Sequence, residues 1–227
     1  MKSISVVICA YNEEKNVRAV IVETVQVLTL MAADFELIVV DDGSSDNSLQ
    51  VIRSCVLNDP RIKIIVHAKN QGIGSALLDG YRIAQKDLVT FLPADGQISP
   101  SDIKLFADNI DGYDMVVSYY IKRPASLLRQ LTSKGVRSIL FLLFGKVPRY
   151  EGTYMFRRRI LEGISLKMHT SFVLNYEFVI RADRQGYKIK EVPTVCLERS
   201  SGNSKVLGIK KILFVFGQLL DLRFKYF

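Results

Sequence analysis

Cysteine is scarce in this sequence, and the positions of the three cysteines exclude a disulfide framework. Cys9, Cys55 and Cys196 are odd in number and far apart, and their spacing fits neither disulfides nor a metal site. We therefore expect reduced thiols in a cytosolic protein. We also expect no signal peptide, because Met1-Lys2-Ser3 leads directly into a short strand-like run followed by polar residues.

Histidines, long apolar runs and repeats are also rare or missing. His67 and His169 are the only histidines, and we expect structural or surface roles for both. No apolar run reaches the ~20 residues that span a bilayer. No repeat or low-complexity linker divides the 227 residues, so we expect one domain with a sizeable core.

Charge is divided unevenly along the chain. Residues 1–118 carry 10 Lys and Arg against 16 Asp and Glu, whereas residues 119–227 carry 21 against 7. An acidic half suits a metal ion and the polar part of a nucleotide, and a basic half suits phosphate groups or an anionic membrane surface. No known nucleic-acid-binding motif accompanies the basic residues, so we expect no nucleic acid partner.

Apolar strand-like runs alternate with amphipathic stretches through the first half. Such runs are typical of strands that are buried on both faces of a parallel sheet. The order predicts a three-layer α/β/α sandwich with a mostly parallel central sheet. The predicted strands are 4–9, 35–40, 62–66, 88–92, 115–117, 189–192 and 195–199. The predicted helices are 13–30 with Asn12 as its cap, 47–57 capped by Ser45 or Asp46, 75–84, one that starts at 99–102, 127–143, 172–185 and 209–224.

Polar and acidic turns follow the first four predicted strands. Ligands of parallel sheets bind just beyond the carboxyl ends of the strands. Each turn alone could be only a helix start or a tight turn, but all four fall at the same edge of the sheet. The pattern therefore favours a site for a nucleotide and a divalent cation. The turns are Asn12-Glu13-Glu14, Asp41-Asp42-Gly43-Ser44-Ser45-Asp46, Asn70-Gln71-Gly72-Ile73-Gly74 and Pro93-Ala94-Asp95-Gly96-Gln97.

With Ala10-Tyr11 before the first of them, these ordered motifs resemble the family-2 glycosyltransferases of the GT-A fold. The resemblance is closest to the dolichyl-phosphate mannose synthase-like branch. It extends into the second half of the chain and so covers most of it. The segments that carry it there are Phe156-Arg157-Arg158, Glu177, Glu191-Val192-Pro193, and Arg199 with Ser204-Lys205.

The resemblance implies roles for individual residues. Asp95 and Gln97 would ligate Mg²⁺ or Mn²⁺ on the diphosphate of a nucleotide-sugar donor. The donor would be held by Tyr11, Asn12, Glu13, Asp41, Asp42, Gly72 and Asp95. Donor or acceptor phosphates would be contacted by Arg123, Arg129, Ser133, Arg199, Ser204 and Lys205, of which the three arginines act with Asp95 in catalysis.

Two positions depart from the pattern of the family. The family usually has an acidic residue where this sequence has Pro93, and proline cannot ligate a metal. One or two protein carboxylates are enough for Mg²⁺ when phosphates and water complete its shell, so Asp95 and Gln97 could suffice. The family also tends to have an aspartate some residues before Gly152, and Glu151 could replace it.

The acceptor is predicted from charge and from the last predicted helix. A lipid phosphate is already an anionic nucleophile, so it needs arginines to hold it rather than a strong base. Residues 209–224 are nearly all apolar and are flanked by lysines and arginine, which suits the interface of an anionic membrane. We therefore expect an inverting transferase, peripheral at the cytosolic membrane face, with a polyprenyl phosphate acceptor. Its parts would be residues 1–118 for the nucleotide, 119–205 for the acceptor phosphate and 206–227 for the membrane.

Other interpretations stay open. The acceptor could be a saccharide hydroxyl, and Glu151 or Glu177 would then be the base. A scaffold that binds nucleotide but has lost activity through Pro93 is the non-enzyme alternative. A nucleotidyltransferase is disfavoured, because no glycine-rich, lysine-containing loop follows the first strand. The last predicted helix could also pack in the core or form a dimer interface, and the sequence does not decide between UDP and GDP.

Overall fold

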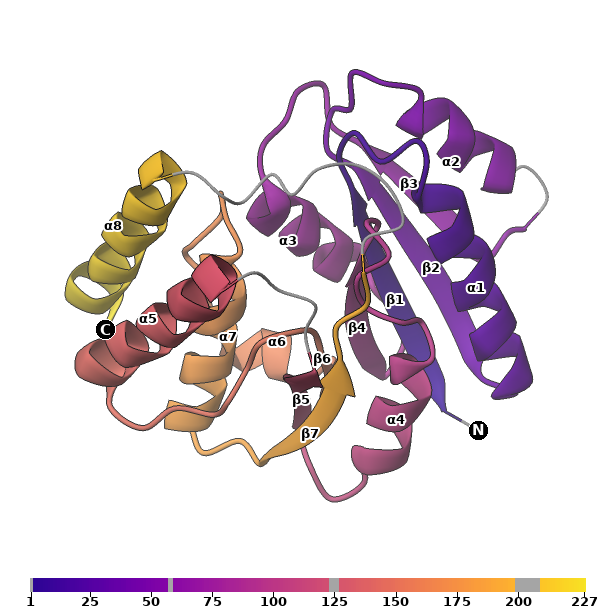
Figure 1. Cartoon of the computed structure of the whole chain (residues 1–227). Helices are drawn as coiled ribbons and strands as arrows, with labels where there is room; N and C mark the ends of the chain where they lie inside the picture. Colours follow the sequence, from indigo (N-terminus) through magenta and orange to yellow (C-terminus); the bar gives the residue numbers. More distant parts are fainter. Residues whose placement is uncertain (1, 57–58, 123–126, 199–208) are drawn as a thin grey trace.

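The computed structural model describes residues 2–56, 59–122, 127–198 and 209–227, with side chains for all of these except 127–134 and 209–212. Seven strands form one sheet in the order β3-β2-β1-β4-β6-β5-β7, and β6 alone runs antiparallel to its neighbours. This confirms the predicted mostly parallel sheet (Figure 1). The strands are β1 (Ser3–Ala10), β2 (Asp34–Asp41), β3 (Ile62–Val66), β4 (Leu88–Pro93), β5 (Met115–Lys122), β6 (Tyr154–Arg157) and β7 (Ile189–Val195).

Helices cover both faces of the sheet, and each face has its own hydrophobic core. Successive side chains of a strand point to opposite faces, so Val7 of β1 packs with one core and Ile8 with the other. One core is closed by α1 (Val17–Leu30), α2 (Ser48–Val56) and α4 (Asp102–Asn109). The other is closed by α3 (Ile73–Ile83), α5 (Leu127–Phe144), α6 (Ile160–Gly163), α7 (Val173–Arg184) and α8 (Ile209–Tyr226).

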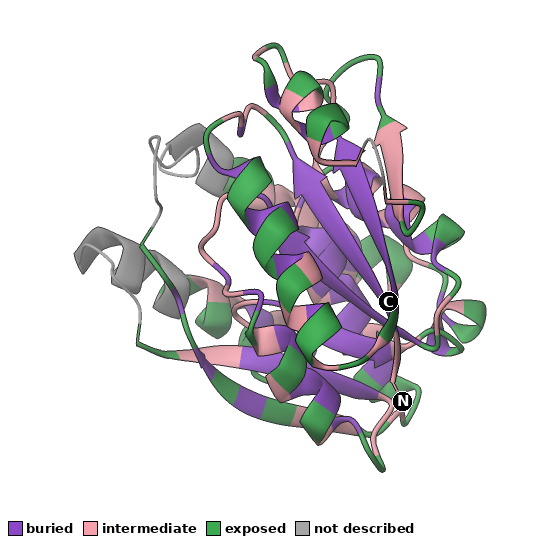
Figure 2. Cartoon of the chain, turned by 90° about the vertical axis from the view of Figure 1, so that its right-hand side faces the viewer, coloured by how far each residue is buried: buried purple, intermediate pink, exposed green. Residues whose placement is uncertain are grey.

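The central strands are buried along nearly their whole length, as continuous apolar runs predict. In β1 seven of eight residues are buried, and in β2 again seven of eight. Figure 2 shows these strands enclosed by helices whose outer faces are exposed. The same enclosure leaves the loops at the strand ends as the places where polar groups can meet a ligand.

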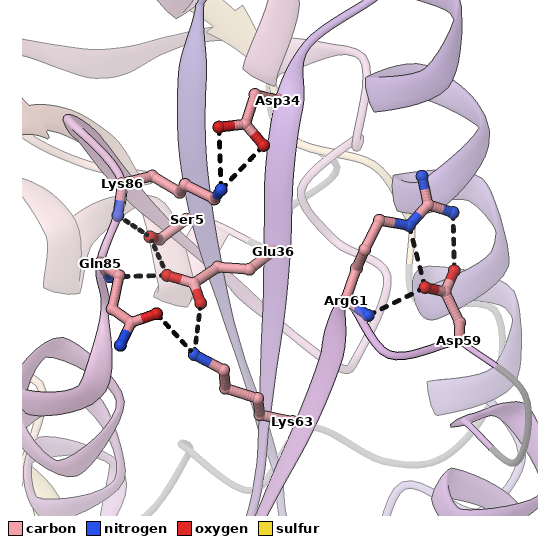
Figure 3. A network of polar contacts seen from close by, with 8 residues as sticks. All are labelled: Ser5, Asp34, Glu36, Asp59, Arg61, Lys63, Gln85 and Lys86. Atoms are coloured by element: carbon pink, nitrogen blue, oxygen red, sulfur yellow. Dashed lines mark hydrogen bonds and ion pairs between the residues drawn. The ribbon is translucent and has the colours of Figure 1, made fainter.

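A polar network ties β1, β2 and β3 together (Figure 3). The carboxylate of Glu36 on β2 is almost fully buried and accepts hydrogen bonds from Ser5 Oγ at 2.7 Å, Lys63 Nζ at 2.7 Å and Gln85 N at 2.6 Å. Burial alone would raise the pKa of Glu36, but the bonds from Lys63, Gln85 and Ser5 outweigh it and hold that pKa below its usual value. The charged carboxylate therefore stabilises this part of the sheet.

Several predicted boundaries were wrong. The first helix begins at Val17 with Asn16 at its N-cap, four residues later than predicted, and Asn12 does not cap it. Asn12 instead has a left-handed backbone, with φ of 53°. The reason is tertiary, because the backbone N–H groups of residues 12–14 donate to side chains of the loop after β2 and of Ser48, the first residue of α2. By contrast, Asp46 caps α2 as predicted, since its Oδ1 accepts from Ser48 N at 2.9 Å.

The second half of the chain also differs from the prediction. The two predicted strands at 189–192 and 195–199 are one strand, β7, which ends at Val195. The four-residue strand β6 and the four-residue helix α6 were not predicted from the sequence. β6 is short and is defined by its pairing with β4 and β5, which are distant in sequence.

Candidate active site

The carboxyl ends of β1, β2, β3 and β4 meet at one edge of the sheet. Ala10 lies opposite Asp41, and Asp41 lies opposite Val66. The strands are also joined just beyond their ends, where Asp42 N donates to the Ala10 carbonyl at 2.8 Å and Ala94 N to the Cys9 carbonyl at 2.9 Å. The structure therefore brings together the four polar turns that follow the first four strands in the sequence.

Asp42 organises this edge. Its Oδ1 accepts a hydrogen bond from Gln71 N at 2.8 Å and lies 2.7 Å from His67 Nδ1. Its Oδ2 accepts from Asn70 Nδ2 at 2.9 Å and from Gly72 N at 2.9 Å. Both carboxylate oxygens are thus used to shape the turn that leads into α3. Hydrogen bonds to a charged acceptor are stronger than neutral ones, so Asp42 fixes this turn firmly.

His67 is buried between two carboxylates. Besides its contact with Asp42, its Nε2 lies 3.1 Å from Asp79 Oδ2 on α3, and Asp79 is paired in turn with Arg82 at 2.6 Å. The imidazole therefore joins the end of β3 to the second turn of α3. No local sequence signal identified this bridge, because its partners lie 25 and 12 residues away.

Asp41 is buried next to Asp42 but is used differently. Its Oδ2 accepts only a long hydrogen bond of 3.3 Å from Ser44 N. Its Oδ1 is the one buried side-chain oxygen or nitrogen in the described part of the chain that lacks a hydrogen-bond partner. An unsatisfied buried acceptor costs roughly 1–3 kcal/mol. Asp41 therefore has one buried carboxylate oxygen, Oδ1, that could accept a hydrogen bond from a ligand.

The loop after β1 is hydrogen-bonded to the segment that follows β2. Ser45 N donates to Asn12 Oδ1 at 2.8 Å, and Glu13 N donates to Ser48 Oγ at 2.8 Å. Glu13 is buried and accepts from Asn16 Nδ2 at 2.7 Å, whereas Tyr11 is 37% exposed at the rim. An exposed aromatic ring beside buried carboxylates is suited to stack on a nucleobase.

The loop after β4 holds the two predicted metal ligands. Gln97 N donates to Asp95 Oδ1 at 3.1 Å, and Gly96 between them has a φ of 71°, a backbone conformation that glycine adopts without strain. The other carboxylate oxygen of Asp95 has no hydrogen bond within the described residues. Those residues contain no group of three or more His, Cys, Asp or Glu that could enclose a metal ion. A cation here would take only part of its shell from the protein.

Cys9 lies at the end of β1, opposite Pro93. Burial, and secondly the charge of Asp42, raise the pKa of the Cys9 thiol well above its usual value. Since the thiolate is the nucleophilic form, Cys9 is not suited to form a covalent intermediate at this edge.

The end of β7 reaches the same edge from the other half of the chain. Leu197 N donates to the Gln97 carbonyl at 2.9 Å, and Cys196 N to the Lys122 carbonyl at 3.0 Å. Four residues of the predicted phosphate-binding set, Arg123, Arg199, Ser204 and Lys205, lie outside the described residues. Arg129 and Ser133 lie in α5, but their side chains are outside the described part.

The two candidate bases are both engaged with other groups. Glu177 is fully buried and accepts from Lys167 N, Met168 N and Arg181 Nε at distances of 2.7–3.0 Å. Glu151 pairs with Arg137 at 3.0 Å and lies 3.6 Å from Arg149. Glu177 is therefore a structural residue, and Glu151 is held by ion pairs with two guanidinium groups.

A family model and several curated proteins match the sequence of this chain. Residues 5–170 match the model described as "Glycosyl transferase family 2". The chain is 30% identical over 228 residues to an undecaprenyl-phosphate 4-deoxy-4-formamido-L-arabinose transferase of Proteus mirabilis, covering 98% of this chain and 68% of that protein. It is 32% identical over 212 residues to the transferase of that name from Yersinia pestis, covering 90% of this chain and 63% of that protein. The chain thus spans about two thirds of the length of these curated relatives.

Solved structures agree with the fold. Glucosyl-3-phosphoglycerate synthase from Mycobacterium tuberculosis, in complex with phosphoglyceric acid, superposes with a TM-score of 0.75 at 23% identity, covering 98% of this chain and 80% of that chain. The same enzyme with Mn²⁺, UDP and glucosyl-3-phosphoglycerate gives a TM-score of 0.71 at 21% identity, with 98% and 80% coverage. The predicted glycosyltransferase fold and family are confirmed: this chain belongs to glycosyl transferase family 2.

Proposed function

We propose that this protein moves a sugar, with inversion, from a UDP- or GDP-sugar to a polyprenyl phosphate at the cytosolic face of a membrane. The observation that carries the proposal is the convergence of four polar turns on one sheet edge, in a chain whose curated relatives are named undecaprenyl-phosphate sugar transferases. In this proposal residues 1–118 hold the donor, 119–205 the acceptor phosphate and 206–227 the membrane surface.

The donor nucleotide would lie over the ends of β1 and β2. Tyr11 would stack on the base, and Asn12 and Glu13 would shape the wall on that side. On the opposite side of the nucleotide, Asp42 would hold the turn at Gly72 in place through its hydrogen bonds to the backbone of that turn. Asp42 would also face the nucleoside. Asp41 supports this placement, because a hydroxyl or N–H group of the nucleoside could satisfy its unpartnered oxygen after a small adjustment.

A divalent cation would bind at Asp95 and Gln97. These oxygen donors suit Mg²⁺ or Mn²⁺, and one carboxylate suffices for Mg²⁺ when phosphates and water supply the other ligands. When bound, the cation would neutralise charge on the diphosphate leaving group. Because Pro93 replaces the usual second acid, we expect weak metal affinity without nucleotide and much stronger affinity with it.

The acceptor phosphate would approach from the side of β7 and α5. A phosphate oxygen attacks the anomeric carbon, the bond from that carbon to the diphosphate oxygen breaks, and the nucleoside diphosphate leaves with the bonding electrons. No proton has to be removed from an ionised acceptor, so the protein needs only to orient and neutralise two anions. Arg123, Arg129 and Arg199 are proposed for that role, and residues 196–198 lead to Arg199 from beside Gln97.

A saccharide hydroxyl is a less suitable acceptor for this site. It would require a general base, and both candidates, Glu151 and Glu177, are held by arginines. This observation favours the lipid phosphate within the family.

The membrane surface would be formed by two neighbouring helices, α5 and α8, which pack against each other on one side of the molecule (Figure 1). Both expose large apolar side chains. In α5 these are Phe141 and Leu142, and in α8 they are Leu213, Phe214, Phe216, Phe224 and Tyr226. No helix in the described ranges combines the length and hydropathy that crossing a bilayer requires. Helices of this kind lie in the interface with their apolar side chains among the lipids.

A transfer assay tests the proposal. The full chain would be incubated with each of several UDP- and GDP-sugars and Mn²⁺, with and without undecaprenyl phosphate, and the lipid fraction analysed by mass spectrometry. We expect one donor to give a glycosylated lipid phosphate only when the lipid is present, and Asp95→Asn to reduce the rate by at least about 100-fold. Binding of nucleotide without transfer from any donor would instead support the inactive scaffold.

A further inference from the structure

Gln218 interrupts the apolar sequence of α8, and its amide is held by the segment that precedes α7. Its Nε2 donates to Thr170 Oγ1 at 2.7 Å, and its Oε1 accepts from Ser171 Oγ. Ser171 Oγ also accepts from Val173 N at 3.1 Å, in the first turn of α7. One side chain of α8 thus fixes both hydroxyl groups of the segment 169–171.

The segment 169–171 lies directly against the start of α3. A Cβ at Gly72 would collide with the carbonyl oxygen of Thr170, and a Cβ at Gly74 with that of His169. Ser75 Oγ adds a hydrogen bond of 3.1 Å to the His169 carbonyl. The two glycines are therefore needed for close approach of the two backbones, and the turn at Gly72 is packed directly against the segment 169–171.

The same glycine turn is part of the donor site. Gly72 N donates to Asp42 Oδ2 at 2.9 Å, and Gly72 is the N-cap residue of α3 with a φ of 93°. A continuous set of contacts therefore leads from Gln218 on α8, through Thr170 and Ser171, to the turn that Asp42 holds. The two ends of this set of contacts, Gln218 and Asp42, are far apart in the sequence.

We infer that Gln218 is a positioning residue for the donor site, which links the lipid-facing helix α8 to the turn at Gly72. With Gln218 in place, α8 holds the segment 169–171 against the glycines and keeps the turn in the shape that binds nucleotide. When α8 lies on a membrane its position is fixed further, so nucleotide binding strengthens. By reciprocity, nucleotide strengthens membrane binding by the same factor. The membrane part of this inference rests on the proposed function, whereas the effect of Gln218 on nucleotide binding in solution does not.

The test uses Gln218→Met, which keeps the length of the side chain and removes its hydrogen bonds. Calorimetry would measure the affinity of the full chain for UDP and for GDP, each with Mn²⁺, with and without vesicles of phosphatidylglycerol and phosphatidylethanolamine. The matched control is Gln26→Met, on the exposed face of α1. A second variant, Thr170→Val, removes one partner of Gln218 without changing α8, and thermal unfolding checks that each variant folds.

We expect Gln218→Met and Thr170→Val to weaken nucleotide binding in solution by roughly 5- to 10-fold, at the lower end of the usual range for coupling between sites, while Gln26→Met has no effect. Vesicles should tighten nucleotide binding by the wild type about 5-fold or more, and should have no effect on Gln218→Met. Equal nucleotide affinities of Gln218→Met, Thr170→Val and wild type would overturn the positioning role. If the variants bind nucleotide more weakly but vesicles leave the wild type unchanged, the positioning role holds and the membrane link is refuted. If no form binds either nucleotide, both the inference and the proposed function are wrong.

Discussion

Replacing Phe214 and Phe224 of α8 by aspartate should release the protein from anionic membranes. Phe214 is 55% exposed and Phe224 is 77% exposed, although both are large apolar side chains. Leu219 and Leu222 of the same helix are buried in the core, so α8 is anchored without these two phenylalanines. The substitutions therefore change the surface of the helix and leave its packing in place.

The size of the effect follows from the exposed area. Burying a whole phenylalanine side chain contributes roughly 1.5–3 kcal/mol. The exposed parts of Phe214 and Phe224 should then contribute about 1–2 kcal/mol each on entering the lipid interface. A loss of about 3 kcal/mol for the pair corresponds to a fall of roughly 100-fold in the partition coefficient. Repulsion of the new carboxylates by anionic lipids adds to that loss.

Co-sedimentation with phosphatidylglycerol vesicles measures the partition coefficient directly. The matched control is Leu30→Asp, which changes an apolar residue that is 86% exposed on α1, on the opposite face of the sheet. The control should bind vesicles as well as the wild type. High salt should weaken binding of the wild type without abolishing it, because salt screens charges and not apolar contacts. Equal binding by the double variant and the wild type would refute the lipid contact, and the exposed face of α8 would then belong to a protein interface.

Three further outcomes follow from the site and the sheet. Asp95→Asn should lower the affinity for UDP or GDP in the presence of Mn²⁺ by at least about 10-fold, yet leave the affinity in EDTA unchanged; calorimetry that shows equal metal-dependent affinity would exclude Asp95 as a ligand. Asp42→Asn should weaken nucleotide binding in EDTA as well, because it weakens the turn at Gly72; a loss seen only with metal would place Asp42 in the metal shell. Glu36→Gln should cost about 1–3 kcal/mol in the free energy of unfolding at pH 7, measured in urea. Since the pKa of Glu36 is lowered in the folded state, its stabilisation is fully present above the ordinary value of 4.5 and is lost as pH falls from there through the folded-state pKa, so a difference from wild type that does not shrink as the pH is lowered below 4.5 would contradict this role.

The first half of the fold was predictable because its signals are local. The apolar runs of β1 and β2 are long and continuous, and their polar ends fall at one edge once the strands are parallel. The start of α1 was not predictable in this way. Asn12 and Glu13 have the residue types of a helix start, but their backbone N–H groups donate to the side chains of Ser44 and Ser48, and the helix begins only at Val17.

The roles of single residues were less predictable than their location. The adjacent aspartates Asp41 and Asp42 look alike in sequence, yet four groups from the β3–α3 segment contact the carboxylate of Asp42 and none contacts that of Asp41. His67 and Gln218 gave no signal, since their partners are distant in sequence. The sequence was misleading for Glu177. Its acidic side chain made it a candidate base, but in the structure it is a buried group that accepts hydrogen bonds from the backbone.

Acceptor discrimination tests the central claim most directly. With a donor that the protein accepts, the rate of sugar transfer would be compared between undecaprenyl phosphate and undecaprenol, two lipids that differ only in the phosphate. We predict transfer to the phosphate and none to the alcohol, because the two carboxylates that could act as a base for an alcohol, Glu151 and Glu177, are both held by arginines. Transfer to undecaprenol at a comparable rate, or to a free saccharide in preference to the lipid phosphate, would contradict this prediction.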